Sequence, residues 1–303
     1  MKVLVYDSGI SEEQKKSIKV TDLGFGVIDE AKHGSVVCDI ISLLAPSARI
    51  ESVKILDSDN STTLNVLINA LKYGLDSDCD IICLALSVEC ENNCSSLREV
   101  MRKLDESGKI VVCSNMNRTD HSLPAAYDSV IGCRTQFNAP DSRIYVKGRD
   151  IQSSIPVLSV WRIIDGSFVR LTGNSLSCAV MAAETAYLAQ ERNLSSRTEV
   201  ENALAVMKWN DYRFYRYSSV WEESDNCEML NDTFEKIQTI AKRYNIKNDQ
   251  PLYMIKDTEK FLNELHNASI FSKEKMILQH YNLESCEALA KFICKNNNKG
   301  VQI

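Results

Sequence analysis

The stretch Gly173-Asn174-Ser175-Leu176-Ser177-Cys178-Ala179 leads directly into an almost wholly apolar run that ends at Ala189. The glycine permits a tight turn, and a hydroxyl follows it two residues later, where a helix begins. A helix that is apolar on all sides is a buried helix. The pattern therefore predicts that Ser175 lies at the N-terminus of a core helix, where backbone N–H groups point outward. Taken alone, the same pattern also fits an ordinary N-cap serine.

Two other stretches favour a catalytic interpretation. The chain opens with Lys2-Val3-Leu4-Val5-Tyr6-Asp7-Ser8-Gly9, which is typical of a buried parallel strand with Asp7 at its C-terminal end. Later, His33-Gly34-Ser35-Val36-Val37 opens a second apolar helix. Asp, His and Ser thus follow one another in the chain order of the subtilisin triad, which differs from the order in chymotrypsin.

The boxes around these three residues resemble those of the subtilisin-like serine proteases. Tyr6-Asp7-Ser8-Gly9-Ile10 resembles the Asp-(Ser/Thr)-Gly box, and His33-Gly34-Ser35 resembles the His-Gly-Thr box with serine in place of threonine. The stretch 173–179 is similar to Gly-Thr-Ser-Met-Ala-(Ser/Thr)-Pro, with Asn174 for threonine and Ala179 for proline. The resemblance covers roughly residues 1–195, and the remainder of the chain matches nothing in the family core.

Two further matches concern the oxyanion hole. Ile110-Val111-Val112-Cys113-Ser114-Asn115-Met116-Asn117 is similar to the strand whose terminal asparagine lines that hole in the family, and the position falls on Asn117. If the alignment slips by two residues, Asn115 takes this place. The following Leu123-Pro124-Ala125-Ala126-Tyr127-Asp128-Ser129-Val130-Ile131 resembles the family stretch Pro-Ala-x-Tyr-x-x-Val-Ile.

The resemblance implies a role for each matched residue. Ser175 would be the nucleophile, His33 the general base and then acid, and Asp7 the group that orients the imidazole. Asn117 would donate its side-chain amide to the developing oxyanion. The family's substrate-binding strand reads Ser-Leu-Gly-Gly, whereas this chain reads Ala85-Leu86-Ser87-Val88, so side chains replace glycines and should narrow specificity. The residues expected to contact substrate are Ala85, Leu86, Ser87 and Asn115.

Composition narrows the possible partners. The 303 residues are 44% hydrophobic, which suffices for a sizeable core in one large domain or two smaller ones. A net charge of −6 without a basic stripe argues against nucleic acid and against an anionic membrane, and leaves a peptide or protein substrate as the expected partner. No cofactor or metal is expected, because Asp57-Ser58-Asp59-Asn60 fits a turn better than a calcium loop.

The N-terminus and the cysteines indicate a cytoplasmic protein. The first strand lacks the features of a signal peptide, and no apolar run approaches transmembrane length. The family's N-terminal arm and pro-domain are not recognisable, which is expected of a pared-down intracellular form or of a mature fragment. Eleven cysteines without a secretory signal predict reduced thiols that act as small buried apolar residues. Cys90 and Cys94 form a pair without a second pair at zinc spacing.

Apolar runs and helical periodicities alternate through residue 114. This alternation predicts an α/β fold, a doubly wound and mostly parallel sheet with helices on both faces. The expected strands are 2–6, 49–56, 80–86, 109–114, 129–134, 143–147 and 155–161, and the expected helices are 33–44, 63–75, 95–107 and 198–207. A polar loop is expected over 10–32 and a hairpin around Asp165-Gly166.

The residue pattern changes after Asn193, where short amphipathic helices are expected. We expect a catalytic domain over 1–219 and a helical appendage over 220–303, with helices at 230–245, 257–267, 272–280 and 284–295. Because these helices are amphipathic, the appendage either braces the core or holds the substrate. The aromatic stretch 209–217 fits a packing seam, or alternatively a surface that stacks on a peptide.

Three functions agree with these features. The first is an intracellular serine endopeptidase of narrow specificity, such as one that matures a peptide precursor by removing its leader. The second is a catalytically idle subtilisin fold that binds peptides, against which the intact set Asp7, His33, Ser175 and Asn117 argues. The third, a broad degradative protease, is disfavoured because without a pro-domain it would damage its own cytoplasm.

Overall fold

The computed structural model describes residues 1–88, 94–117, 122–135, 153–155, 159–208, 227–247, 250–271 and 277–298. The chain forms two compact units, each of which consists of more than one segment. Unit 1 comprises Met1–Val157 and Leu171–Arg213, and unit 2 comprises Leu158–Arg170 and Phe214–Ile303. The boundary expected at residue 219 lies outside the described residues, and unit 2 also takes an internal segment that the sequence analysis had placed in the catalytic domain.

Unit 1 is built on a seven-stranded parallel sheet in the order β2-β3-β1-β4-β5-β6-β7. Its strands are β1 (Lys2–Asp7), β2 (Lys19–Thr21), β3 (Arg49–Lys54), β4 (Ile81–Leu84), β5 (Ile110–Ser114), β6 (Val130–Thr135) and β7 (Ser153–Ile155). The strand order reverses between β1 and β4, and in sheets of this kind ligands bind at the carboxyl ends beside that reversal. The loop expected over 10–32 contains the short edge strand β2, which finds its partner only in β3.

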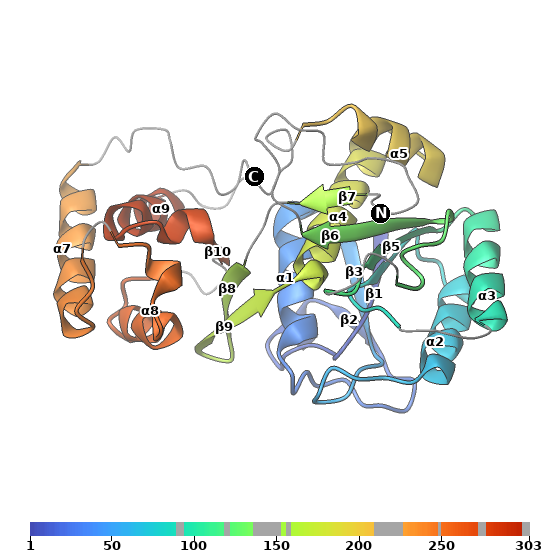
Figure 1. The fold of residues 1–303 in the computed structure, drawn as a ribbon, viewed down its shortest axis with the longest axis horizontal. Helices are drawn as coiled ribbons and strands as arrows, with labels where there is room; N and C mark the ends of the chain where they lie inside the picture. The colour runs from blue at the N-terminus through green and yellow to red at the C-terminus, as the bar shows by residue number, and fades with distance from the viewer. Residues whose placement is uncertain are drawn as a thin grey trace. The chain divides into compact units, whose positions relative to one another are not determined.

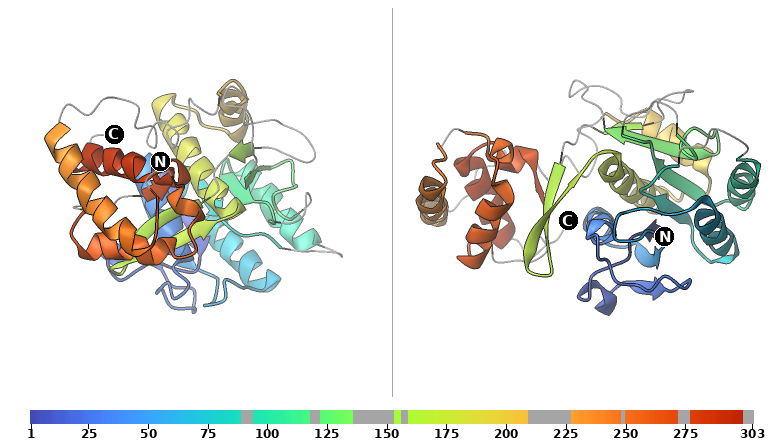
Figure 2. Two further views of the ribbon diagram at one scale, coloured as in Figure 1. Left: turned by 60° about the vertical axis from the view of Figure 1, so that its left-hand side comes forward. Right: turned by 60° about the horizontal axis from the view of Figure 1, so that its bottom comes forward.

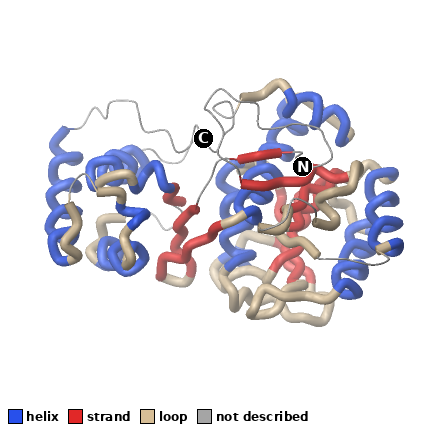
Figure 3. Tube along the Cα trace, in the orientation of Figure 1, coloured by secondary structure: helices blue, strands red, loops and turns tan. Residues whose placement is uncertain are grey.

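Helices cover both faces of this sheet (Figures 1 and 3). Helices α2 (Leu64–Asp76) and α3 (Ser95–Glu106) share one apolar cluster with β1, β3, β4 and β5. On the other face, α1 (His33–Leu44) packs against α4 (Asn174–Glu191), and α4 also contacts β4, β5 and β6. The short helix α5 (Arg197–Ala205) contacts α4. The expected doubly wound α/β fold is therefore confirmed.

Helix α4 has the buried character that its sequence predicts. It is buried without interruption from Leu176 to Ala186, and its Cys178 lies 3.8 Å from Cys83 of β4 across the helix–sheet interface. Since side chains surround the helix on every side, its N-terminal turn has little freedom to move. Ser175 is thereby carried on a rigid element.

A buried carboxylate ties the edge of the sheet together. Glu51 of β3 is fully buried and accepts hydrogen bonds from Lys2, Lys19, Thr21 and Tyr73. Burial alone would raise the pKa of Glu51, but these four donors outweigh it and lower the pKa from 4.5 to about 2. A depressed carboxyl pKa stabilises the fold above pH 4.5, and this stabilisation is lost as the pH falls toward 2.

Replacing Glu51 with alanine is therefore expected to reduce the free energy of unfolding by about 3 kcal/mol, because the mostly buried Lys2 ammonium loses its buried partner. Urea-induced unfolding at neutral pH measures this loss. Glu99→Ala is the matched control, since it removes an exposed carboxylate that pairs with Arg102 and should cost far less. Equal losses in the two variants would contradict the role given to Glu51.

Within the residues that the structure describes, unit 2 combines a small sheet with three longer helices (Figure 2). Its three-stranded sheet has the order β10-β8-β9, and β10 pairs antiparallel with β8. The elements are β8 (Ser159–Ile164), β9 (Ser167–Thr172, whose last two residues belong to unit 1), α7 (Cys227–Arg243), α8 (Thr258–Asn267), β10 (Ile277–Gln279), α9 (Cys286–Asn298) and the 3-10 helices η3 (Leu252–Met254) and η4 (His280–Leu283). The two central hairpin residues, Asp165 and Gly166, have φ values of 49° and 76°, as the tight two-residue turn expected there requires.

The structure corrects two sequence predictions in this region. The helix expected over 272–280 is wrong, because Ile277–Gln279 is a buried strand that pairs with β8. The strand expected over 155–161 is two strands, β7 in unit 1 and β8 in unit 2. The expected strand at 143–147 and the aromatic stretch 209–217 lie outside the described residues.

The hairpin is part of the core of unit 2. Trp161 and Phe168 are buried together with Ile237, Phe261 and Phe292 of the three helices. Removing the chain from about residue 228 onward would therefore expose the hairpin's apolar face rather than trim a separate appendage.

Eight cysteines of the described residues are free and buried, which is how the sequence analysis expects them to behave. Burial raises the pKa of the Cys113 and Cys178 thiols, so both stay protonated. Cys94 differs, because it is disulfide-bonded, and the expectation that all thiols are reduced is corrected at this position. Within the described parts of the chain, no helix is both long and apolar enough to span a bilayer.

Candidate active site

The sequence-predicted residues gather at one edge of unit 1. Asp7 ends β1, Ala85 directly follows β4, and Asn117 follows β5, so all three lie at the carboxyl ends of neighbouring parallel strands. This edge adjoins the reversal of strand order between β1 and β4, where ligand sites are expected in such sheets. His33 and Ser175 come to the site from the N-terminal turns of α1 and α4.

Asp7 and His33 form a close polar pair. The Nδ1 atom of His33 lies 2.7 Å from Oδ1 of Asp7, and Asp7 is fully buried while the His33 side chain is 15% exposed. Oδ1 of Asp7 also accepts a hydrogen bond of 2.7 Å from the N–H of Ser8. A carboxylate on Nδ1 fixes the tautomer that leaves Nε2 free to accept a proton.

Gly34 allows the start of α1, which carries His33, to lie this close to Asp7. A Cβ atom at Gly34 would lie 2.4 Å from the carbonyl oxygen of Gly9 and 3.1 Å from the Cβ of Asp7. Any larger residue would therefore push the start of α1 away from the end of β1. The glycine that follows His33 is a packing requirement of the Asp7–His33 pair.

A second buried carboxylate lies behind this pair, and the sequence analysis missed it. Asp29 is fully buried; its Oδ1 accepts from the Ser8 hydroxyl at 2.7 Å and its Oδ2 from the Ser35 N–H at 2.7 Å. The Ser8 hydroxyl in turn accepts from the N–H of Gly34 at 2.9 Å. The available signal was a carboxylate four residues before the histidine, in a stretch that the sequence analysis expects to be a polar loop.

The two carboxylates set the charge state of His33. Burial of the imidazole acts to lower its pKa, but the charge and hydrogen bond of Asp7 and the charge of Asp29 outweigh burial. The net effect is a His33 pKa above 6.5. The site therefore favours the imidazolium that a general base becomes after it has accepted a proton.

Ser175 lies in the first turn of α4 and is partly exposed. Gly173 has φ 86°, a left-handed conformation that turns the chain sharply into the helix. The Ser175 hydroxyl donates a hydrogen bond of 2.8 Å to the carbonyl oxygen of Ala85. In this first turn, the N–H of Asn174 donates to Oδ1 of Asn117 at 2.9 Å and the N–H of Leu176 donates to the carbonyl oxygen of Gly173 at 3.1 Å.

The structure brings the side chain of Asn117 to this turn. Its Oδ1 accepts a hydrogen bond of 2.9 Å from the N–H of Asn174, and a Cβ added to Gly173 would lie 2.6 Å from the same oxygen. Because Oδ1 accepts this hydrogen bond, Nδ2 is the part of the Asn117 amide that is left to donate. The alternative, Asn115, is buried, and its Nδ2 makes a long 3.4 Å contact with the carbonyl oxygen of Cys133.

The substrate-strand residues differ in exposure. Ala85 and Leu86 are buried, and Leu86 belongs to the apolar cluster under α2 and α3. Ser87 is partly exposed and is thus the position at which a side chain in place of glycine meets the surface. Val88 is bridged to Leu123 by two backbone hydrogen bonds of 2.8 and 3.3 Å, which fixes this strand end.

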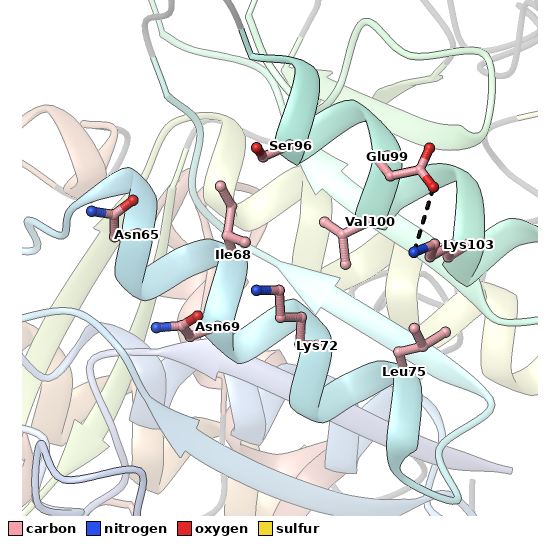
Figure 4. A pocket seen from close by; sticks show the side chains of 9 residues that line it. All are labelled: Asn65, Ile68, Asn69, Lys72, Leu75, Ser96, Glu99, Val100 and Lys103. Atoms are coloured by element: carbon pink, nitrogen blue, oxygen red, sulfur yellow. Dashed lines mark ion pairs between the residues drawn. The ribbon is translucent and has the colours of Figure 1, made fainter.

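The acidic turn at Asp57 and the groove between α2 and α3 contain none of these candidate site residues. Asp57 accepts from the N–H groups of Asp59 and Ser61 and so caps a turn. No cluster of three His, Cys, Asp or Glu side chains suited to a metal ion occurs in the part of the chain that the structure describes. A groove of about 690 Å³ runs between the outer faces of α2 and α3 (Figure 4). Its lining residues are Asn65, Ile68, Asn69, Lys72, Leu75, Ser96, Glu99, Val100 and Lys103.

Bacterial proteins of similar sequence include a thermophilic serine proteinase and a subtilisin. The thermophilic serine proteinase of Bacillus sp. (strain AK1) is 26% identical over 203 residues, which is 61% of this chain and 50% of that protein. Subtilisin E of Bacillus subtilis (strain 168) is 24% identical over 201 residues, 58% of this chain and 50% of that protein. The chain thus spans half the length of these two relatives.

A solved structure and a family model extend the comparison. The prenylagaramide maturation protease PagA superposes with a TM-score of 0.52 at 17% identity, covering 67% of this chain and 81% of that one. At this identity, the likeness shows a shared fold. The model described as the subtilase family matches residues 5–213, which is well over half of the chain. The chain belongs to the subtilase family.

Proposed function

We propose that the protein is a serine endopeptidase that uses Asp7, His33 and Ser175 as its triad and Asn117 as an oxyanion donor. The observation that carries this proposal is the 2.7 Å contact between His33 Nδ1 and the buried Asp7, at the same sheet edge as the first turn of α4. A hydroxyl needs a base, and the base needs an orienting carboxylate, before serine becomes a nucleophile at neutral pH.

The reaction begins when the Ser175 hydroxyl leaves the Ala85 carbonyl and turns to Nε2 of His33. Its oxygen attacks the scissile carbonyl carbon while its proton passes to Nε2, and Asp7 stabilises the imidazolium. The oxyanion accepts hydrogen bonds from the Ser175 N–H and from Nδ2 of Asn117. His33 then gives the proton to the leaving amine, and a water molecule activated by His33 hydrolyses the acyl-enzyme and frees Ser175.

We further propose that the enzyme has narrow specificity and matures a peptide precursor in the cytoplasm. The partly exposed Ser87 side chain stands where the family pattern has glycine and reduces the room beside the strand. PagA, which shares the fold, is described as a maturation protease. Of the cysteines that the structure describes, eight are free and buried, which suits a reducing compartment, whereas the disulfide at Cys94 does not.

Cleavage of a peptide library by the purified full chain tests this function. Mass spectrometry of the products should find new termini at a restricted set of sequences. The competing function is an idle subtilisin fold that binds peptides, and it would retain peptides without producing any new terminus. Cleavage spread over most sequences would contradict narrow specificity while leaving the endopeptidase function intact.

The rate should fall on acidification with a midpoint above pH 6.5, because only neutral His33 accepts a proton and the two carboxylates hold its pKa above that value. Asp29→Asn removes one of those charges and should move the midpoint of the kcat/KM profile to lower pH. Asp57→Asn, which changes an exposed loop carboxylate, should leave the midpoint in place. A rate that stays flat from about pH 5 to 8 would exclude His33 as the base.

A further inference from the structure

Asn174 stands where the family pattern has threonine, and its side chain is fully engaged. Its Nδ2 donates to the carbonyl oxygens of Asn115 at 2.9 Å and Met116 at 3.0 Å, and its Oδ1 accepts from the N–H of Thr135 at 2.7 Å. The residue is 9% exposed. Both amide hydrogens and the amide oxygen are thus used, whereas the single hydroxyl of a threonine has only one hydrogen to donate.

These bonds connect three elements at the site. The carbonyls of Asn115 and Met116 belong to the segment that leaves β5 and leads to Asn117, and Thr135 ends β6. Asn174 itself is the first residue of α4 and immediately precedes Ser175. One side chain therefore fixes the position of the Asn117 segment relative to the helix that carries the nucleophile.

The backbone of Asn174 completes the arrangement. Its N–H donates to Oδ1 of Asn117 at 2.9 Å, which occupies the amide oxygen and leaves the Nδ2 hydrogens of Asn117 as donors. Asn117 is itself exposed, and its amide lies against Gly173, where an added Cβ would come within 3.1 Å of Nδ2. An oxyanion donor acts only if it is held in place before the charge develops.

We propose that Asn174 is a positioning residue that holds the oxyanion donor Asn117 beside Ser175. This inference rests on the proposed function and adds the residue that fixes the oxyanion hole in this chain. It explains why the departure from threonine is compatible with catalysis: the longer amide secures the Asn117 segment at two carbonyls and ties it to β6.

A double-mutant cycle tests the proposal. Asn174→Ala should lower kcat by about 10- to 100-fold with little change in KM, because a small misplacement of a catalytic group has effects of this size. In the Asn117→Ala background the same change should lower kcat by less than about twofold, because the group that Asn174 positions is already absent. Independent, multiplicative losses would overturn the proposal, as would an unchanged kcat in the single variant.

Ser177→Ala is the matched control. Ser177 is fully buried in the next part of α4, and its hydroxyl lies 2.8 Å from that of Thr135 at the end of β6. This variant should keep kcat within about twofold of the wild type. If it loses as much kcat as Asn174→Ala, the effect is a general loosening of the helix start and the proposal fails.

A second variant guards against misfolding. Asn174→Ser keeps a hydroxyl able to make one of the three bonds, and it should show an intermediate kcat if Asn174→Ala does not fold, as judged by thermal unfolding. Wild-type kcat in Asn174→Ser would contradict the proposal. Failure of the proposed function itself is distinguishable, because the wild type would then not hydrolyse peptides, or Asn117→Ala alone would leave kcat unchanged.

Discussion

Ser175→Ala is expected to abolish peptide hydrolysis, with a loss in kcat of about 10⁶-fold, which is the size known for the nucleophile of subtilisin itself. The physical reason is that the variant lacks the only atom able to form the acyl-enzyme. The fold should persist, because Ser175 is partly exposed and the change removes the hydrogen bond from its hydroxyl to the Ala85 carbonyl. Steady-state kinetics on a peptide found by library cleavage measures the loss.

The control for this variant is Ser177→Ala, which removes a hydroxyl two residues further along the same helix. It should retain turnover. Hydrolysis that survives in Ser175→Ala at more than a trace would show that another group is the nucleophile. The triad assignment would then be wrong, although membership of the family would stand.

Asn117→Ala should lower kcat by about 10²- to 10³-fold with little change in KM, the effect known for the oxyanion asparagine of subtilisin. The amide is expected to bind the oxyanion more strongly than the ground-state carbonyl, so its removal affects the transition state selectively. Asn115→Ala is the informative comparison, because Asn115 is buried and its amide is directed at Cys133.

Asn115→Ala should therefore lower the free energy of unfolding, and its effect on kcat should be smaller than that of Asn117→Ala. The reverse pattern, with a large kcat loss in Asn115→Ala and none in Asn117→Ala, would mean that the sequence alignment is displaced by two residues. Both variants replace an asparagine with alanine, so any difference between them reflects the position of the residue in the segment that follows β5.

The local sequence was sufficient to predict the bounds and the burial of elements whose own residue pattern determines them. Helix α1 begins and ends at the residues predicted, His33 and Leu44, because an apolar run is bounded by a histidine-glycine pair and by Pro46. The same holds for α4, whose uniformly apolar sequence requires burial on all sides. The order of strands and helices then follows from their alternation, since parallel strands need crossover connections.

Sequence was insufficient where a distant partner decides the structure. Ile277–Gln279 is a strand because β8 offers it a pairing edge, and no local periodicity carries that information. The hairpin around Asp165 was predicted, but its assignment to unit 2 depends on Phe261 and Phe292, about a hundred residues further along the chain.

In the candidate site, too, some residues could be predicted from local sequence and others depend on distant partners. The resemblance named Asp7, His33, Ser175 and Asn117, and the structure brings His33 to Asp7 and Asn117 to the turn before Ser175. It could not reveal Asp29 or the contacts of Asn174, because both depend on hydrogen bonds between separate segments of the chain. Those contacts become visible only when the carboxyl ends of β1, β4, β5 and β6 are assembled along one edge of the sheet.

The most direct test of the account is the site of reaction with a fluorophosphonate. The folded protein should take up one adduct, and peptide mass spectrometry should place it on Ser175, because only an activated serine attacks phosphorus at neutral pH. Ser175→Ala and heat-unfolded wild type should take up none. An adduct on another residue, or a folded wild type that cleaves no peptide and forms no adduct, would contradict the claim that this subtilase-family chain is a serine endopeptidase acting through Ser175.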